Sequence, residues 1–413
     1  MDKSLGRFLE AQNTYYQQAL DEIKGGKKYS HWIWFIFPQL EQLGHSWNAK
    51  FYGLSDLEEA KAYWNHDLLR QRLVTICEQL LQHKDTPIQQ IMGQLDAMKL
   101  KSSMTLFDQV VPHAVFEQVL QTFFDGKRDP MTLHLLMPVP KMILGAVAGD
   151  IIGSVYERQN IHTTDFHLFS PFCRFTDDSV MTLAVAKWLM EENLTDEALV
   201  ETMQDLGRTY LNAGYGRQFQ KWLITPNPQP YESWGNGSAM RVSPVGWYAS
   251  SLEEALHLAA VTAKVSHNHP EGIKGAQAIA AAMFWAREGK SKNEIKTLIE
   301  QHFNYDLQQT LDEIRPTYRF DVSCQGSVPQ AIIAYLEGNS FEEVIRLAIS
   351  IGGDSDTIGA MAGAIAACTY PIPEKISRKC YHILTEDLKN ILLQFTNFID
   401  KRTNTTRLKN EKL

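Results

Sequence analysis

The stretch IGGDSDTIGAMAGAIAAC, residues 351–368, decides how this sequence is interpreted. It places two carboxylates, Asp354 and Asp356, after a glycine pair and directly ahead of a run of small and apolar residues. The run predicts a buried helix with both acids at its N-terminus. A helix dipole stabilises a neighbouring anion by only about 0.3–1 kcal/mol, too little to offset two carboxylates that meet in a partly buried place. Because a bound cation would resolve this conflict, the stretch predicts a metal site.

A second acidic cluster stands about 180 residues earlier, in FTDDSVMTLAVA at residues 175–186. Capping of the following helix is the alternative explanation for it, although one N-cap needs one side chain rather than three. The two clusters together supply carboxylate and hydroxyl oxygens, which suit magnesium, manganese or calcium rather than zinc. Six such ligands would suffice for two octahedral ions, namely Thr176, Asp177, Asp178, Asp354, Asp356 and Thr357.

The segment MILGAVAGDIIGSVYE, residues 142–157, predicts an apolar helix with a flat ridge. Gly145, Gly149 and Gly153 recur every four residues, so a neighbouring helix can approach closely along them. Asp150 and Glu157 are seven residues apart, and we expect them on one face of this helix. Solvent exposure of both acids is the alternative, but so apolar a helix has little solvent face.

Two further segments have the composition of ligand loops. In GNGSAMRVSPVG, residues 235–246, the loop around Gly237 and Ser238 could hold a phosphate on exposed backbone N–H groups, and an ordinary glycine turn is the alternative. In VSHNHPEG, residues 265–272, His267 and His269 stand between two helices. Zinc would need a further matching ligand nearby and none is apparent, so surface histidines are the simpler interpretation there.

The length and periodicity of the chain predict an all-α protein of two helical domains. The 413 residues exceed one ordinary core, and helical spacing of apolar residues recurs without a competing set of alternating strands. Prolines after residue 129 mark the boundary. We predict a helical domain of unknown function at residues 1–130, a Pro-containing linker at 131–141, a second domain at 142–398 and a disordered tail at 399–413.

Composition excludes several classes of protein. A formal charge of −8 and a pI near 5.9 argue against broad binding of nucleic acid, although a local basic pocket is compatible with them. The first residues show no apolar segment behind a basic one, and no apolar run reaches the length of a membrane span, so we expect neither secretion nor membrane insertion. The five scattered cysteines predict free thiols in a reducing cytoplasm.

Four segments of the chain are, in order, GAVAGDIIGSVYE, FTDDSVMTLAVA, GNGSAMRVSPVG and AISIGGDSDTIGAMAGAIA. Together they resemble the ADP-ribosylglycohydrolase family, which includes the bacterial dinitrogenase reductase-activating enzymes. The resemblance covers about residues 142–395. It implies an orthogonal helix bundle that binds two Mg²⁺ or Mn²⁺ ions. It also implies an enzyme that hydrolyses the bond between ADP-ribose and a modified acceptor, either a protein side chain or a related small molecule.

The same resemblance assigns roles to individual residues. The metal ligands are the six residues named above. Glu157 matches the acid that closes over the site, and either Glu157 or one of the liganding acids Asp177, Asp178 and Asp354 is expected to act as the base. The residues expected at the substrate are Asp150 of the Gly-Asp motif, Gly237 and Ser238 of the diphosphate loop, and His267 at the nucleotide. For Asp150 we also expect an outer-shell or helix-orienting role.

Two rival functions stay open at this point. The first is a catalytically silent ADP-ribose-binding or structural protein, which would be expected to lose metal ligands, whereas all six positions are filled here. The second is a metal-dependent hydrolase of a free ADP-ribose derivative.

Residues 5–110 resemble a small all-helical bacterial family of unassigned function that is sometimes labelled calpastatin-like. The segments YSHWIWFIFPQLEQLGHSW and LDAMKLKSSMTLFDQV carry this resemblance. This stretch predicts a buried aromatic core, with a stacking platform for an adenine or nicotinamide ring as the alternative, formed by His31, Trp32, Trp34, Phe35 and Phe37.

Overall fold

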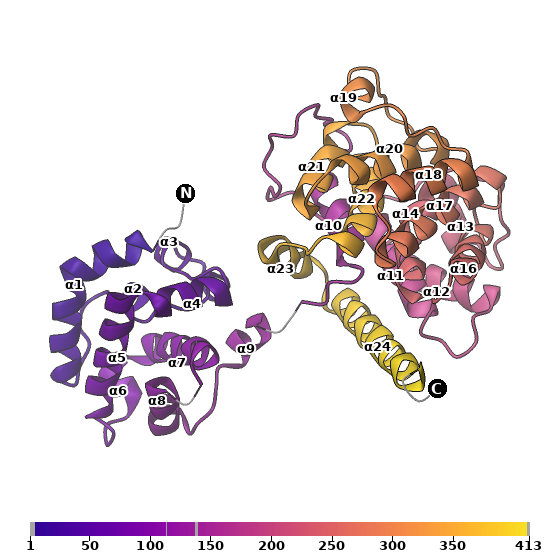
Figure 1. Ribbon diagram of the computed structural model, residues 1–413. Coiled ribbons are helices and arrows are strands. Elements are labelled where there is room, and N and C mark those ends of the chain that lie inside the picture. The colour runs from indigo at the N-terminus through magenta and orange to yellow at the C-terminus, as the bar shows by residue number, and fades with distance from the viewer. Residues whose placement is uncertain (1–4, 113, 137–138, 411–413) are drawn as a thin grey trace. The chain divides into compact units, whose positions relative to one another are not determined.

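The computed structural model describes residues 5–112, 114–136 and 139–410. These residues form helices joined by loops, and their only β-type pairings are two isolated bridges, Leu40 with Leu54 and Gly235 with Ser323. The predicted all-α class is therefore confirmed. The chain divides into two compact units, residues 1–138 and 139–413, and each has its own apolar core (Figure 1). No helix in the described part of the chain has both the length and the apolar composition needed to cross a membrane.

The N-terminal unit buries Trp32, Phe35 and Phe37 in its core, whereas Trp34 is half-buried and His31 is exposed. Trp32 and Phe37 are each 1% exposed and Phe35 is buried beside them, so this cluster forms core rather than a stacking platform. The Trp32 indole N–H donates to the Glu22 carboxylate at 2.9 Å, which satisfies the one polar atom of the buried ring. The helices of this unit are α1 (Gly6–Lys24), α2 (Ile33–Ile36), the 3₁₀ turn η1 (Glu41–Leu43), α3 (Trp47–Phe51), α4 (Leu57–Asn65), α5 (Asp67–Leu81), α6 (Ile88–Met92), α7 (Gln94–Val110), α8 (Val115–Phe124) and α9 (Pro130–Leu136).

The C-terminal unit is a larger bundle of crossing helices (Figure 1). Its helices are α10 (Leu144–Gly153), α11 (Asp177–Trp188), α12 (Asp196–Thr209), α13 (Arg217–Ile224), α14 (Gly237–Met240), α15 (Ser243–Tyr248), α16 (Leu252–Lys264), α17 (Pro270–Arg287), α18 (Lys292–Phe303), α19 (Leu311–Ile314), α20 (Cys324–Glu337), α21 (Phe341–Ser350), α22 (Ser355–Thr369), α23 (Glu374–Ile383) and α24 (Glu386–Asn410).

Glycines hold α10 and α22 together at backbone distance. A Cβ atom built on Gly153 would lie 2.5 Å from the Cα atom of Asp356, and one built on Gly359 would lie 2.8 Å from the carbonyl oxygen of Gly149. Real side chains do not tolerate such distances, so both helices need glycine along this contact. The flat ridge predicted for residues 142–157 is the surface that α22 occupies.

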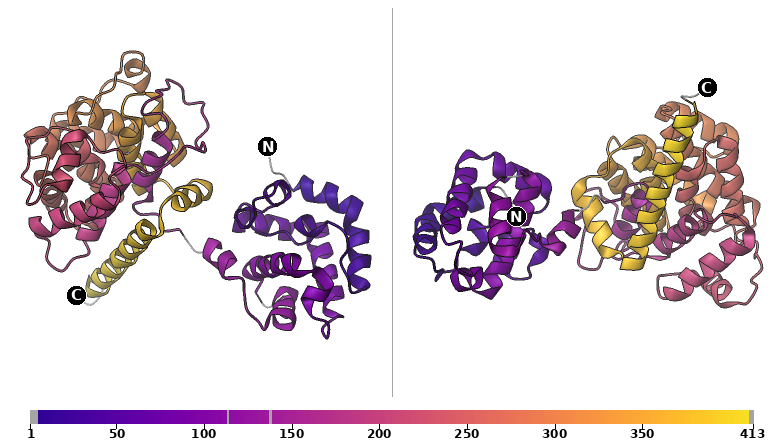
Figure 2. Two further views of the ribbon diagram at one scale, coloured as in Figure 1. Left: turned by 180° about the vertical axis from the view of Figure 1, so that it is seen from behind. Right: turned by 90° about the horizontal axis from the view of Figure 1, so that it is seen from below.

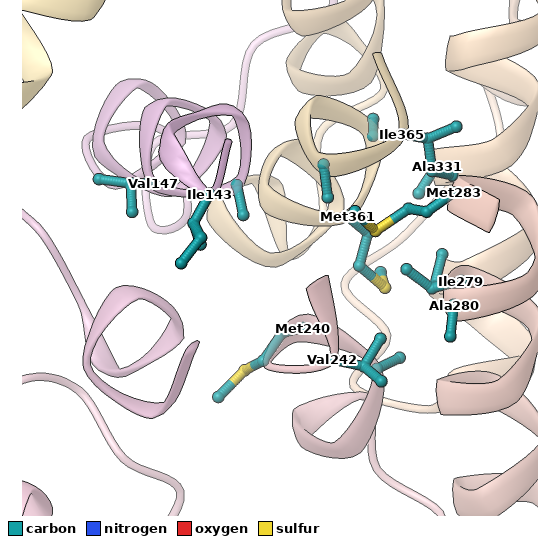
Figure 3. Close-up of a cluster of buried hydrophobic side chains, with 14 of the residues drawn as sticks. Ile143, Val147, Met240, Val242, Ile279, Ala280, Met283, Ala331, Met361 and Ile365 are labelled. Atoms are coloured by element: carbon teal, nitrogen blue, oxygen red, sulfur yellow. The ribbon is translucent and has the colours of Figure 1, made fainter. Parts of the chain in front are cut away.

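Helix α22 is the centre of the C-terminal core. Every residue from 355 to 366 is buried, because α10 covers one side of the helix and α17, α20 and α21 cover the others. Figure 3 shows Met361 and Ile365 of α22 between Val147 of α10, with the N-cap residue Ile143, on one side and Met283 of α17 on the other. The N-terminus of this buried helix carries the acidic residues of the candidate site.

The predicted helix over residues 142–157 is too long. Helix α10 ends at Gly153, and residues 154–159 form turns and bends. Glu157 therefore stands on a loop. Our expectation that it shares a helix face with Asp150 is wrong. The 3.6-residue spacing persists in the sequence beyond the point where the tight contact with α22 ends.

The predicted linker at residues 131–141 is partly helical. Helix α9 occupies residues 130–136, and Asp129 accepts hydrogen bonds from the backbone N–H and the hydroxyl of Thr132 at 2.8 and 2.6 Å. Leu135 lies in the N-terminal core. Residues 137 and 138 lie outside the described residues.

The tail that we predicted to be disordered, residues 399–413, is helical up to residue 410. Helix α24 runs through it and lies along one side of the C-terminal unit (Figure 2). Ile399 is buried, and Arg402 pairs with Glu254 at 3.3 Å while its guanidinium lies 3.9 Å from the ring centroid of Tyr248. These few contacts anchor a segment whose composition alone favours disorder. Residues 411–413 lie outside the described part.

The glycine contact leads to a stability prediction. We expect Gly149→Ala to destabilise the C-terminal unit by about 1–3 kcal/mol, because the added methyl group would meet the backbone of Gly359 and force the helices apart. Differential scanning calorimetry should show the corresponding transition lowered by about 2–4 °C per kcal/mol. Gly216→Ala is the control, since nothing lies within 4 Å of a Cβ atom there. An unchanged transition in Gly149→Ala would contradict the close-contact argument.

Candidate active site

A cavity of about 520 Å³ opens in the C-terminal unit, within the size range of small-molecule sites. Helices α10, α11, α14 and α22, whose ends and connecting loops surround it, lie together in the middle of this unit (Figure 1). Most of the predicted site residues line this one cavity: Glu157, Thr176, Asp177, Asp178, Gly237, His267, Asp354, Asp356 and Thr357. Asp150 and Ser238 are the two predicted residues that are not among its lining residues.

The first acidic cluster stands at the N-terminus of α11, where Thr176 is the N-cap. The Thr176 hydroxyl accepts from the backbone N–H of Asp178 at 3.2 Å and donates to the Asp150 carboxylate at 2.7 Å. Thr176 therefore caps the helix, as the structural alternative proposed. The carboxylates of Asp177 and Asp178 are not needed for that cap and face the cavity.

Asp150 orients α11 from behind the cavity wall. Its carboxylate is fully buried and accepts from the backbone N–H groups of Thr176 and Ser179, at 2.9 and 3.1 Å, and from both of their hydroxyls. Burial nevertheless raises the pKa of Asp150 to about 6. Because these donors surround the carboxylate, the expected contact between Asp150 and substrate does not fit, whereas a helix-orienting role does.

The second acidic cluster follows a left-handed turn. Gly352 and Gly353 have φ angles of +78° and +70°, which side chains with a Cβ atom rarely adopt. The Asn160 side chain clamps this turn, since it accepts from the Gly353 N–H at 2.8 Å and donates to the Gly353 carbonyl at 3.0 Å. Asp354 is the N-cap residue of α22 but makes no capping hydrogen bond, and its carboxylate accepts from the Asn236 amide at 2.7 Å. Helix capping thus does not explain Asp354.

The two clusters meet through one hydrogen bond. The Thr357 hydroxyl donates to a carboxylate oxygen of Asp178 at 3.2 Å, across 179 positions of sequence. The other carboxylate oxygen of Asp178 is buried and has no hydrogen-bond partner among the described residues. Burial and the neighbouring carboxylates raise the pKa values of Asp178 and Asp356 well above the usual value for an aspartate. The same causes raise the pKa of Asp177 to about 7.

These side chains fit a hard divalent cation by their chemistry. Buried carboxylates that repel one another, hydroxyls beside them and one orphaned carboxylate oxygen are the donors such an ion takes. Within the described residues, however, no three His, Cys, Asp or Glu side chains are arranged so that they could hold an ion together. Protein donors such as Asn236 and Thr357 occupy several of the carboxylate oxygens. To bind a cation, these carboxylates would therefore have to change conformation and give up their present hydrogen bonds to protein donors.

Glu157 lies at the edge of the cavity, on the loop after α10. Its backbone carbonyl accepts from the Asn160 amide at 2.9 Å, and the same amide also holds Gly353. Asn160 thus ties the loop of Glu157 to the turn that carries Asp354. The Glu157 side chain is half-buried and makes no hydrogen bond or ion pair in the described part of the chain.

The predicted diphosphate loop is only partly at the cavity. Gly237 lines it, and a Cβ atom at that position would lie 3.0 Å from the Nε2 atom of His267. Ser238 is fully buried, and its hydroxyl donates to the carbonyl of Gly272 at 2.7 Å. The expected contact between the Ser238 side chain and substrate is therefore not supported, because that hydroxyl joins α14 to α17.

A buried arginine stands behind His267. Arg241 is fully buried, lines the cavity and donates from Nη2 to the Ser266 hydroxyl at 2.7 Å. The Ser266 hydroxyl lies 2.8 Å from the Nδ1 atom of His267. We infer that the Ser266 hydroxyl, which accepts from arginine, gives its own proton to Nδ1, so that the histidine proton stays on Nε2, beside Gly237. Burial and the charge of Arg241 hold the pKa of His267 well below its usual value.

Several lining residues were not among those predicted from sequence. Asn236 and Arg241 lie in the glycine loop that drew attention for its backbone, and their polar side chains within an apolar segment were the available signal. Asn160, which holds the turn at Gly353 without lining the cavity, was singled out by no local pattern. Others line the mouth of the cavity: Arg158, Arg174, Arg217, Ser233, Trp234, Phe320 and Val322.

Comparisons with known proteins divide the chain in the same way. Residues 139–405 match the family model described as ADP-ribosylglycohydrolase, and residues 2–136 match a model described as a protein of unknown function, DUF1810. The match to DUF1810 extends to residue 136, whereas the resemblance that we described from the sequence ended at about residue 110.

Individual relatives are distant in sequence. The ADP-ribosylhydrolase ARH3 of Homo sapiens is 28% identical, in a match that covers 58% of this chain and 87% of that protein. The ADP-ribosylarginine hydrolase Tri1 of Pseudomonas putida (strain GB-1) is 25% identical and covers 56% of this chain and 70% of its own length. The crystal structure of the conserved hypothetical protein Rv1873 from Mycobacterium tuberculosis is 41% identical, with a TM-score of 0.32, over 32% of this chain and 96% of that one.

The Arg241–Ser266–His267 arrangement leads to a spectroscopic prediction. We expect ¹⁵N shifts of histidine-labelled protein to show His267 neutral and protonated on Nε2 at pH values where an ordinary histidine is charged, because burial and Arg241 both hold its pKa down. Ser266→Ala should give a mixture of tautomers, since Nδ1 loses its donor. Ser251→Ala, at the N-cap of α16, is the control and should leave the signal unchanged. An Nδ1-protonated His267 in the unmodified protein would contradict the assignment.

Proposed function

The chain belongs to the ADP-ribosylglycohydrolase family through residues 139–405, and we propose that it hydrolyses the glycosidic bond between ADP-ribose and a modified acceptor at a centre of two divalent cations. The family acts on ADP-ribosylated substrates and is generally metal-dependent. One observation carries the proposal for this chain. Two clusters of hard oxygen ligands, far apart in sequence, meet through Thr357 and Asp178 in one substrate-sized cavity.

We propose that the cations are Mg²⁺ or Mn²⁺. They would supply positive charge that orients the ribose hydroxyls and acidifies a water molecule. The chain offers carboxylates that repel one another until such charge is present, which supports a metal centre better than a structural ion pair. The residues proposed to hold the ions are Thr176, Asp177, Asp178, Asp354, Asp356 and Thr357.

Glu157 is our choice for the general base. Cleavage of the bond to ADP-ribose passes through an oxocarbenium-like state, so water must be deprotonated beside the ribose carbon. Asp178 and Asp354 accept hydrogen bonds from protein donors, whereas the described chain provides no donor to the Glu157 carboxylate. Its loop position also lets Glu157 reach over the cavity.

The ADP half of the substrate is proposed to lie along the glycine loop. His267 offers an Nε2–H donor beside Gly237, and Arg241 adds a positive charge behind it. Trp234 is 48% exposed and presents an aromatic face on which an adenine ring could stack. These groups suit a nucleotide diphosphate better than a neutral sugar.

We also propose an alternative substrate class and a cellular compartment. A hydrolase of a free ADP-ribose derivative would use the same residues, so it is the alternative that the substrate panel below distinguishes.

All five cysteines are free, which supports a reducing compartment, and we propose the cytoplasm.

The first test offers the full-length protein a panel of ADP-ribosylated arginine, serine and phosphate substrates, together with free derivatives such as acetylated ADP-ribose. We expect ADP-ribose release that EDTA abolishes and Mg²⁺ or Mn²⁺ restores. Asp356→Asn should lower both metal affinity and kcat by at least 100-fold, because a ligand is lost. Glu157→Gln should lower kcat by about 10²–10⁴-fold with metal affinity unchanged.

The control for both variants is Glu288→Gln at the end of α17, an exposed carboxylate that does not line the cavity. Release that survives chelation would contradict the metal centre. Equal losses of metal affinity in Glu157→Gln and Asp356→Asn would contradict the separate role of Glu157.

A second test concerns pH and metal together. Folded-state pKa values of about 6 for Asp150 and about 7 for Asp177 lie above the usual aspartate value, so the metal-free protein binds more protons folded than unfolded. The contribution of these two groups to the free energy of unfolding should be complete below about pH 4. It should be lost as the pH rises to about 7. Added Mg²⁺ should reverse the loss at pH 7 and have little effect at pH 5, because cation and protons compete. Thermal unfolding at both pH values measures this, and an Mg²⁺ effect independent of pH would contradict it.

A further inference from the structure

A second cavity, of about 310 Å³, lies at the loop that joins α19 to α20. Helix α19 stands at the edge of the C-terminal unit, next to α20 (Figure 1). Of the residues that line this second cavity, only Phe320 also lines the candidate active site. The second cavity therefore contains none of the side chains proposed to bind metal or to act in catalysis.

The loop that forms the second cavity is held in place by its own contacts. The Tyr318 hydroxyl donates to the carbonyl of Gly326 at 2.6 Å, and the Ser323 N–H donates to the Asp321 carboxylate at 2.8 Å. The ring of Tyr318 also packs against Gly353, where a Cβ atom would clash with it. The cavity is thus preformed, so a ligand would lose little free energy in ordering the loop.

Two side-chain amides line this cavity with their hydrogen-bonding groups free. Gln309 is exposed and Gln330 is half-buried, and neither side-chain amide makes a hydrogen bond within the described residues. The Oε1 atom of Gln330 is buried without a partner, which costs free energy until a donor reaches it. A glutamine amide matches the edge of adenine, because it donates to the N7 atom and accepts from the N6 amino group.

An aromatic ring, an acid and an arginine lie in the same cavity. Phe320 is 53% exposed and makes no ring contact in the described part of the chain, so a base can stack on it. One carboxylate oxygen of Asp321 accepts from Ser323, and the other is free to accept from ribose hydroxyls. The exposed Arg319 makes no ion pair within the described residues, and its guanidinium suits a phosphate.

These groups together match the parts of one nucleotide. The ring suits the face of a base, the amides suit its edge, the carboxylate suits the ribose and the guanidinium suits the phosphate. The volume of about 310 Å³ is at the lower end of the range for small-molecule sites, so it suits a mononucleotide better than a ligand as large as ADP-ribose. A peptide could use the amides, but it would leave the combination of ring, carboxylate and guanidinium without a purpose.

We propose that the second cavity binds an adenine mononucleotide such as adenosine monophosphate (AMP), separately from the substrate in the candidate active site. Gln309 and Gln330 contact the edge of the adenine ring, and Phe320 stacks on its face. Asp321 accepts from the ribose hydroxyls, and Arg319 binds the phosphate. This inference goes beyond the proposed hydrolase function and does not depend on it.

Equilibrium dialysis of the full-length protein with radiolabelled AMP tests the proposal. The active site is proposed to hold the ADP half of its substrate, so AMP can bind in both cavities, and the stoichiometry should exceed one molecule per chain. Arg319→Gln together with Gln330→Leu should weaken one of the two binding events by about tenfold or more. The other binding event, and KM for an ADP-ribosylated substrate, should stay unchanged. Arg319→Gln alone, at an exposed position that does not threaten folding, should act in the same direction.

A nucleotide analogue tests the adenine assignment. Purine riboside monophosphate lacks the N6 amino group, so it should bind the second cavity about fivefold or more weakly than AMP. The matched control variant is Gln325→Leu together with Lys290→Gln. Both residues are exposed and line neither cavity, so this variant should bind AMP as the unmodified protein does.

Each of the other outcomes contradicts the proposal. A stoichiometry of one molecule per chain, unchanged in Arg319→Gln with Gln330→Leu, would mean that no second site exists. A raised KM in that variant would make the cavity part of the active site. Equal affinity for purine riboside monophosphate would refute adenine, and equally tight binding of inorganic phosphate would reduce the site to an anion site. None of these results bears on the hydrolase, which stands or falls on the release of ADP-ribose.

Discussion

The close contact between α10 and α22 is the constraint on which the candidate site depends. Glycines on both helices bring the backbones together without intervening side chains, as at Gly153 against Asp356 and Gly359 against Gly149. Neither helix can be displaced outward without opening a void in the centre of the core. The N-terminus of α22, with its acidic residues, is thereby fixed against the C-terminal end of α10.

The same helix positions the other half of the site. Asp150 projects from α10 and receives four hydrogen bonds from the first turn of α11, so the position of Thr176 and the aspartates after it follows from that of α10. A single helix thus contacts α22 through its glycines and α11 through one carboxylate. Asn160, on the loop that follows α10, adds a third connection to the turn at Gly353.

The cavity separates charge in a way that suits its proposed chemistry. Carboxylates crowd its floor, and their raised pKa values express the free-energy cost of placing like charges together in a buried position. Positive groups lie at two other places, Arg241 behind the glycine loop and the exposed arginines at the mouth. We infer that the floor would be neutralised by cations, and that the arginines would then face the anionic parts of the substrate.

The sequence by itself determined the all-α class, the division into two units and the identity of the two acidic clusters, because helical periodicity, prolines and unusual acids beside apolar runs are local signals. It did not determine that α10 ends before Glu157, that the Ser238 hydroxyl binds the carbonyl of Gly272, or that α24 continues through a polar tail. Asn160, Asn236 and Arg241 gained their roles only in the folded chain. Each of these features depends on a partner far away in sequence, such as Gly353, Asp354 or Ser266. Hydrogen bonds and burial between such partners form only when tertiary packing brings them together, so no local pattern can encode them.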